Sequence, residues 1–133
     1  VELTPALLAS PQVLPGWPAA RLIPRDFPDY ATREIVHAVE VHTTGAPDMS
    51  LFDKIIFVAD YTEPGRKQSV CRQTRDRMWE QLQGETDKRR ILDVTACRIL
   101  GDTLQYLHEN NRPAVSSTEN AYRYLVRELS DRE

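Results

Sequence analysis

The longest regular pattern in the sequence is helical and runs from Ile91 to His108. Its apolar and threonine side chains recur at intervals of three and four residues: Ile91, Leu92, Thr95, Ile99, Leu100, Thr103, Leu104 and Leu107. That spacing places them on one face of an α-helix. No segment of the chain shows the sustained period-two alternation of a half-buried strand. A long amphipathic helix must bury its apolar face against other helices, so the sequence predicts an all-α domain.

The same spacing predicts about five helices in all. The other four are expected over residues 32–42, 51–59 and 70–82 and after Ser116. The second of these is apolar nearly all round, which predicts a central, buried helix. The third is rich in charge and should turn Val70, Met78 and Leu82 inward. Ser50 with Asp53, and Ser116 with Glu119, have the spacing of capping boxes that start helices.

The N-terminal segment differs from the rest of the chain. Residues 1–28 hold six of the nine prolines. Proline removes a backbone donor and disfavours helix in the residue before it. We therefore expect a loop-rich segment over residues 1–30, with one short helix around Trp17–Ile23, and a helical domain over residues 31–133.

Composition limits the partners and the compartment. The net charge of −3 gives no overall attraction for nucleic acid or for an anionic membrane. The longest apolar run is too short to span a bilayer. The two cysteines, Cys71 and Cys97, lack CxxC spacing, and no targeting segment opens the chain. We expect reduced thiols in a cytoplasmic protein that binds neither nucleic acid nor membrane.

One histidine and one aspartate are the first candidates for chemistry. His42 closes one predicted helix, and Asp60 follows the apolar run from Ile55 to Ala59. A carboxylate buried at the end of such a run is costly unless it is paired or binds a cation. Histidine and aspartate on neighbouring helices are suitable ligands for a first-row metal. An aspartate that caps a helix or pairs with Arg66, together with a structural histidine, would explain the same residues.

The order of residues around this pair resembles a known family. The 25 residues from His42 to Arg66 read HTTGAPDMSLFDKIIFVADYTEPGR. This segment closely resembles a block typical of the YqeK family of HD-domain proteins. There a His-Thr-Thr-Gly turn is followed by Met-Ser, a Lys-Ile-Ile helix, Ala-Asp and Glu-Pro-x-Arg. A looser resemblance extends over roughly residues 7–125, which points to the C-terminal portion of such a protein.

The resemblance implies an HD-domain-like helical bundle with a phosphohydrolase activity. Members bind two iron or similar ions through histidines and aspartates, and they hydrolyse diadenosine tetraphosphate symmetrically to ADP. Two cations polarise the scissile phosphate and generate a hydroxide near neutral pH. The implied metal ligands are His42 and Asp60. The implied substrate-binding residues are Thr43, Thr44 and Gly45, in the turn that orients His42, and Lys54 and Arg66, which would hold phosphates or nearby carboxylates.

The sequence departs from the family at several ligand positions. It contains no His-Asp dipeptide, and Pro15-Gly16 stands where the family has a His-Gly ligand motif. Val115, Ser117 and Tyr122 stand where the family has a histidine, an aspartate and an arginine. Neither His37 nor His108 matches a ligand position. Iron or another divalent metal is therefore expected only if ligands from outside this chain complete the site.

Three interpretations stay open at this point. One is a hydrolase for dinucleoside polyphosphates whose other ligands lie in a longer parent. Another is a catalytically inactive HD-like module that binds a nucleotide or a protein, such as an appendage of a larger nucleotide-metabolism enzyme. The third is a helical domain without a small-molecule site. A homodimer, or a fused or partner domain, also stays open.

Overall fold

The computed structural model describes residues 16–84 and 87–132 of the chain. These residues form six α-helices and one 3₁₀ turn, and no strand. The elements are α2 (Gly16–Asp26), η2 (Pro28–Tyr30), α3 (Arg33–Val41), α4 (Leu51–Thr62), α5 (Ser69–Gly84), α6 (Lys88–Glu109) and α7 (Ser116–Asp131). The predicted all-α class is confirmed, and the short N-terminal helix extends three residues beyond its expected end at Ile23. The domain boundary at residue 30 stays a prediction.

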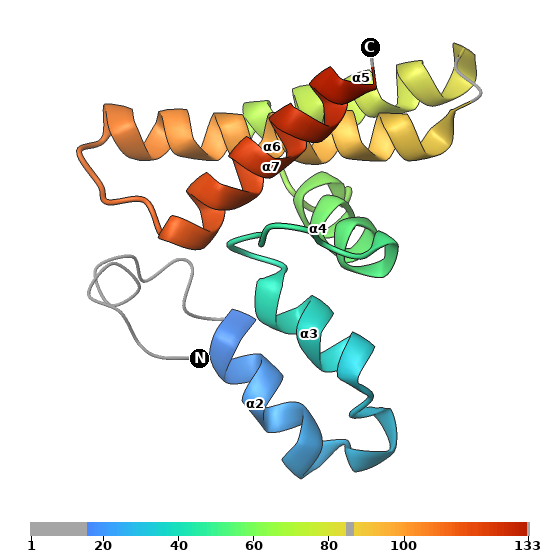
Figure 1. Ribbon diagram of the computed structural model, residues 1–133, viewed down its shortest axis with the longest axis vertical. Helices are drawn as coiled ribbons and strands as arrows, with labels where there is room; N and C mark the ends of the chain where they lie inside the picture. The colour runs from blue at the N-terminus through green and yellow to red at the C-terminus, as the bar shows by residue number, and fades with distance from the viewer. Residues whose placement is uncertain (1–15, 85–86, 133) are drawn as a thin grey trace.

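The helices form two groups that α4 joins. Figure 1 shows α2 and α3 as a pair at one end, and α5, α6 and α7 packed together at the other. Helix α4 lies between them and contacts α3, α5 and α6. The core is built where these helices meet, from Val41, Met49, Phe57, Val58, Ala96, Ile99, Leu100, Ala121 and Leu125. Helix α6 contributes Ala96, Ile99 and Leu100 to this core, as its long apolar pattern predicts. Within residues 16–84 and 87–132, no helix has the length and apolar character needed to cross a membrane.

Local capping signals set where the helices begin. The predicted capping box of α4 is confirmed: Asp53 N donates to Ser50 Oγ at 3.0 Å, and Ser50 N donates to Asp53 Oδ2 at 3.1 Å. The side chain of Thr32 caps α3 in the same manner, through Ile35 N at 3.2 Å. Each cap satisfies a backbone donor that the first turn leaves without a partner. The capping box therefore determines that α4 begins at Leu51, directly after the loop of residues 43–50.

Some expectations about which side chains are buried are wrong. Helix α4 is not buried all round, because Leu51, Phe52 and Ile55 are 42%, 39% and 47% exposed. Val70 is exposed rather than inward-facing, and Cys71 and Thr74 are buried in its helix instead. The side chain of Trp79 on the same helix is also exposed. The spacing of apolar residues predicts which face of a helix points inward. The width of the buried face depends on how many other helices pack against it.

The predicted capping box of Ser116 and Glu119 is wrong as well. Helix α7 takes Val115 as its N-cap, in extended backbone, and no side chain caps it. Ser116 is thus the first residue inside the helix, one position too late to act as the cap. The nearby hydroxyl of Thr118 is buried and bonds instead to the distant loop after α3.

Candidate functional site

His42 lies at the C-terminal end of α3, with one ring nitrogen fixed by the backbone. Its Nδ1–H donates to the carbonyl oxygen of Val39. Because a carbonyl only accepts, Nδ1 carries the proton, and the neutral ring keeps its lone pair on Nε2. The hydroxyl of Thr43 lies 3.4 Å from that Nε2. A histidine whose second nitrogen donates to a carbonyl has the arrangement that orients metal-ligating imidazoles.

The turn that follows His42 is held by two distant helices. Gly45 has a φ of +73°, a conformation that side chains with a Cβ rarely adopt. Its N–H donates to the carbonyl of Val41 at 2.8 Å, and a Cβ placed on it would lie 3.0 Å from Leu100 Cδ2 of α6. The hydroxyl of Thr118 in α7 donates to the carbonyl of Thr44 at 2.7 Å. These contacts hold the turn against the core. They thereby also hold His42, which directly precedes the turn.

Asp60 lies near the end of α4 and is not deeply buried. The sequence predicts a carboxylate deep in the helix, whereas its side chain is 40% exposed. Arg66 holds it through a bond of 3.1 Å from Nη2 to Oδ1, and the same arginine donates from Nε to the backbone carbonyl of Asp60 at 3.0 Å. The pairing with Arg66, which is one of the alternatives that the sequence leaves open for Asp60, is present. The remaining guanidinium N–H groups keep the capacity to bind another anion.

A cavity of about 760 Å³ brings these residues together. Its lining includes His42 and Thr43 from the end of α3, Asp60 from α4, and Arg66 from the loop that follows. The start of α5 and the second half of α6 complete its walls, with residues that include Val70 and Tyr106. This volume falls in the range of roughly 300–1,000 Å³ that is typical of small-molecule sites.

Carboxylates outnumber cations in this cavity. Asp60, Asp102 and Glu109 line it together with a single arginine, Arg66. Asp102 is half-buried and has no hydrogen-bond or ion-pair partner within residues 16–84 and 87–132. Burial, together with the neighbouring side chains of Cys71 and Asp102, raises the pKa of Tyr61 in the same wall. A polyphosphate entering this cavity would be repelled unless cations accompanied it.

Sequence reasoning missed Asp102. The only signal was its spacing on α6, because Asp102 follows Thr95 by seven residues and Ile99 by three, which places it at the edge of the apolar stripe. An acidic residue in that position more commonly faces solvent. Only the packing of α4 and α5 against α6 encloses it.

Lys54 lies elsewhere in the fold. Its Nζ donates to Asp93 Oδ1 at 2.7 Å, and Arg132 Nη2 donates to the other oxygen of the same carboxylate at 2.7 Å. Asp93 is 4% exposed, whereas the side chains of Lys54 and Arg132 are 20% and 40% exposed, so the carboxylate is buried and its two cations keep contact with water. It ties α4, α6 and α7 together, and Lys54 does not line the cavity of His42.

The described residues do not by themselves fit a metal ion. Within residues 16–84 and 87–132, no group of three or more His, Cys, Asp or Glu side chains could hold one. His37 bonds through Nδ1 to the buried carboxylate of Asp53 at 2.9 Å, away from His42. His42 and Asp60 thus stand as a two-residue donor set, and protein metal sites usually need three or four. Pro15, which replaces a family ligand, lies outside the described residues.

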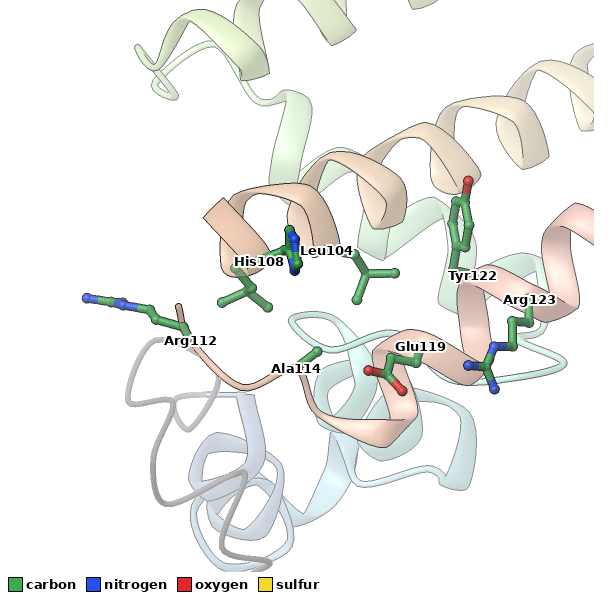
Figure 2. A pocket seen from close by; sticks show the side chains of 8 residues that line it. Leu104, His108, Arg112, Ala114, Glu119, Tyr122 and Arg123 are labelled. Carbon is green, nitrogen blue, oxygen red and sulfur yellow. The ribbon is translucent and has the colours of Figure 1, made fainter. Parts of the chain in front are cut away.

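A second, smaller cavity of about 410 Å³ lies between α6 and the start of α7 (Figure 2). Its α6 residues, Leu104, Leu107 and His108, project from the opposite face of the helix to Asp102 and Tyr106. Figure 2 shows the side chain of Arg112 pointing away from the other labelled residues. Tyr122, at the position where the family has an arginine, also lines this cavity. Its basic groups do not converge, so the cavity of His42 is the better candidate for an anionic ligand.

Comparison with known proteins gives relatives of one kind. No family model matches the chain. The symmetrical bis(5'-nucleosyl)-tetraphosphatase of Halalkalibacterium halodurans is 35% identical over 95 residues, which are 71% of this chain and 46% of that protein. The protein of the same name from Bacillus subtilis is 32% identical over 93 residues, 70% of this chain and 45% of that protein. The chain thus spans less than half the length of these curated relatives.

A solved structure from Clostridium acetobutylicum has the same arrangement of helices. It is described as a predicted HD superfamily hydrolase involved in NAD metabolism. The two structures match with a TM-score of 0.78 and 25% sequence identity. The match covers 96% of this chain and 62% of the other.

Proposed function

Since this chain is homologous to part of the YqeK-type symmetrical bis(5'-nucleosyl)-tetraphosphatases, and has the helical fold of an HD superfamily hydrolase, we propose that its cavity belongs to a metal-dependent phosphohydrolase site. The substrates would be dinucleoside polyphosphates such as diadenosine tetraphosphate. The observation that supports this best is that His42 and Asp60 line one cavity. Because Nδ1 of His42 donates to the carbonyl of Val39, Nε2 is the ring nitrogen that would bind a metal, in place of its 3.4 Å contact with the hydroxyl of Thr43.

The remaining metal ligands would come from outside the described residues. His42 and Asp60 would contribute two donors to iron or another divalent metal, and the rest would lie in a longer parent chain or a partner domain. Arg66 would hold a phosphate with the N–H groups that Asp60 leaves free. The hydroxyl of Thr43, which lines the same cavity, would add a neutral donor. The turn through Thr44 and Gly45 keeps His42 in position rather than touching the substrate.

Metal content and turnover test this proposal together. The longer parent protein, or this chain together with the partner domain that supplies the remaining ligands, should retain Mn²⁺ or Fe²⁺ and release ADP from diadenosine tetraphosphate, as followed by chromatography. His42→Ala should lower both by an order of magnitude or more, because it removes a ligand. His108→Ala is the matched control, since that histidine is exposed on the opposite face of α6. Absence of both metal and ADP release in the wild type would reject the hydrolase.

A second candidate function follows from the two-residue donor set. A module that binds a nucleotide without hydrolysing it needs Arg66 and the cavity, but no complete metal centre. It would fit a regulatory appendage of a larger enzyme of nucleotide metabolism. In that case ADP raises the midpoint of thermal unfolding, Arg66→Ala removes the increase, and diadenosine tetraphosphate is not consumed. Turnover by the wild type would exclude this alternative.

A further inference from the structure

An exposed aromatic ring stands at the cavity of His42. Tyr106 lines this cavity, yet 54% of the residue is exposed to solvent. Its hydroxyl has no hydrogen-bond partner in the part of the chain that the structure describes. Single exposed aromatic residues are common on protein surfaces and mean little alone. The residues that line the cavity with Tyr106 indicate a binding role for its ring.

Tyr106 belongs to a rim that is distinct from the phosphate-binding residues. Helices α5 and α6 run in opposite directions, and the start of α5 lies beside the second half of α6 rather than its last turn (Figure 1). Gln68 directly precedes α5, Val70 lies in its first turn, and Val70 is 40% exposed. The lining of the cavity extends along α6 from Ile99 to Glu109, a rise of about 15 Å at the helical pitch. That length leaves room for a planar ring in addition to phosphate groups.

The neighbour of Tyr106 presents a defined hydrogen-bonding group. The amide Nε2 of Gln105 donates to Glu109 Oε1 at 3.0 Å. Because an ionised carboxylate only accepts, the nitrogen of this amide must face Glu109, and its carbonyl oxygen is left for a ligand. A carbonyl oxygen accepts from the 6-amino group of adenine, whereas it meets another acceptor at the 6-oxo group of hypoxanthine.

We propose that Tyr106, Val70 and Gln105 form a purine-binding rim of this cavity, selective for 6-amino purines. The adenine ring stacks on Tyr106, and its 6-amino group donates to Gln105. Base–aromatic stacking is a common and strong source of nucleotide affinity. The inference rests on the proposed function, since the phosphates bound near Arg66 would carry the base to this rim.

The experiment compares ligands with and without the base. Affinities of the purified protein for ADP, inosine diphosphate and inorganic pyrophosphate are measured by calorimetry with Mn²⁺ present. Tyr106→Leu should weaken ADP binding about tenfold, as expected for loss of a stacked base, and leave pyrophosphate binding unchanged. Tyr106→Phe should keep the affinity for ADP. Tyr30→Ala is the matched control, because Tyr30 is 65% exposed and lies in η2, away from the cavity.

Each outcome decides between the rim and the phosphate site. Equal ADP affinity in wild type and Tyr106→Leu overturns the rim, even if Arg66→Ala abolishes binding. Binding of ADP that depends on Tyr106, without binding of pyrophosphate, supports the rim and rejects the proposed phosphate site. No binding of either ligand by the wild type overturns both. Inosine diphosphate that binds as tightly as ADP removes Gln105 from the rim.

Discussion

At the scale of single residues, the acids that the fold buries are not the one that the sequence singles out. Asp60 follows an apolar run, but the structure buries Asp53 and Asp93 instead, at 2% and 4% exposure. Asp53 accepts from the backbone of Ser50 and from His37, and Asp93 accepts from two cations. Burial of a carboxylate depends on such partners. The partners of Asp93 lie 39 positions away on either side, and sequence spacing gives no sign of them.

The cluster around Asp93 gives a prediction about stability. Asp93→Ala leaves Lys54, whose side chain is only 20% exposed, without its partner. It also removes the ion pairs that link α6 to α4 and to the end of α7. Loss of one member of a buried ion pair costs roughly 3–5 kcal/mol, and we expect about 3 kcal/mol here because Lys54 keeps some contact with water. Arg132→Ala should cost less than about 1 kcal/mol, since Arg132 is 40% exposed.

Urea denaturation measures these free energies of unfolding. Asp76→Ala serves as the control, because Asp76 is an exposed acid on α5 without a partner in the described residues. An Asp93→Ala protein as stable as Asp76→Ala would show that the cluster contributes nothing to the fold.

At the scale of elements, the sequence predicts where helices begin and end better than what they bury. Proline, glycine and capping residues act on their own neighbours, so the capping box at Ser50 and the end of α3 at His42 could be predicted. The start of α7 could not, because extended backbone at Val115 and the long-range bond of Thr118 decide it. The exposed side of α4 was missed for the same reason: its burial is set by three neighbouring helices.

The turn after α3 shows how one local conformation positions the candidate site. Gly45→Ala must hold a Cβ at φ +73° and 3.0 Å from Leu100. The left-handed conformation costs an L-residue roughly 1–2 kcal/mol, and we expect a loss of unfolding free energy of about that size. Affinity for pyrophosphate should fall as well, because the turn fixes His42.

Gly84→Ala is the matched control for this change. Gly84 ends α5, and a Cβ there meets nothing within 4 Å. Alanine should be neutral at this position, or stabilise the helix by up to about 1 kcal/mol. Equal thermal stability of the two variants, followed by circular dichroism, would show that the turn tolerates a side chain.

At the scale of the whole molecule, the described residues supply two candidate metal ligands and the helices that form the cavity around them. The 25 residues from His42 to Arg66 predicted the family, and homology to proteins named symmetrical bis(5'-nucleosyl)-tetraphosphatase confirms that prediction. This prediction was possible because the turn after α3, helix α4 and the loop up to Arg66 are contiguous in the sequence. The cavity is different, since α5 and α6 supply much of its wall from 68 to 109. No local pattern specifies Asp102 or Tyr106 as neighbours of His42.

Helix α7 supports the cavity although none of its described residues lines it. Thr118 bonds to the turn, Ala121 lies beside Gly45, and Leu125 anchors the helix in the core at 3% exposure. Leu125→Ala should therefore cost roughly 2–5 kcal/mol of unfolding free energy. Its neighbour Val126 is 40% exposed, and Val126→Ala should cost far less. If undocking of α7 releases the turn, ligand affinity must fall with stability in Leu125→Ala and stay unchanged in Val126→Ala. A Leu125→Ala protein that loses stability but binds pyrophosphate normally at low temperature would show that the turn holds its shape without α7.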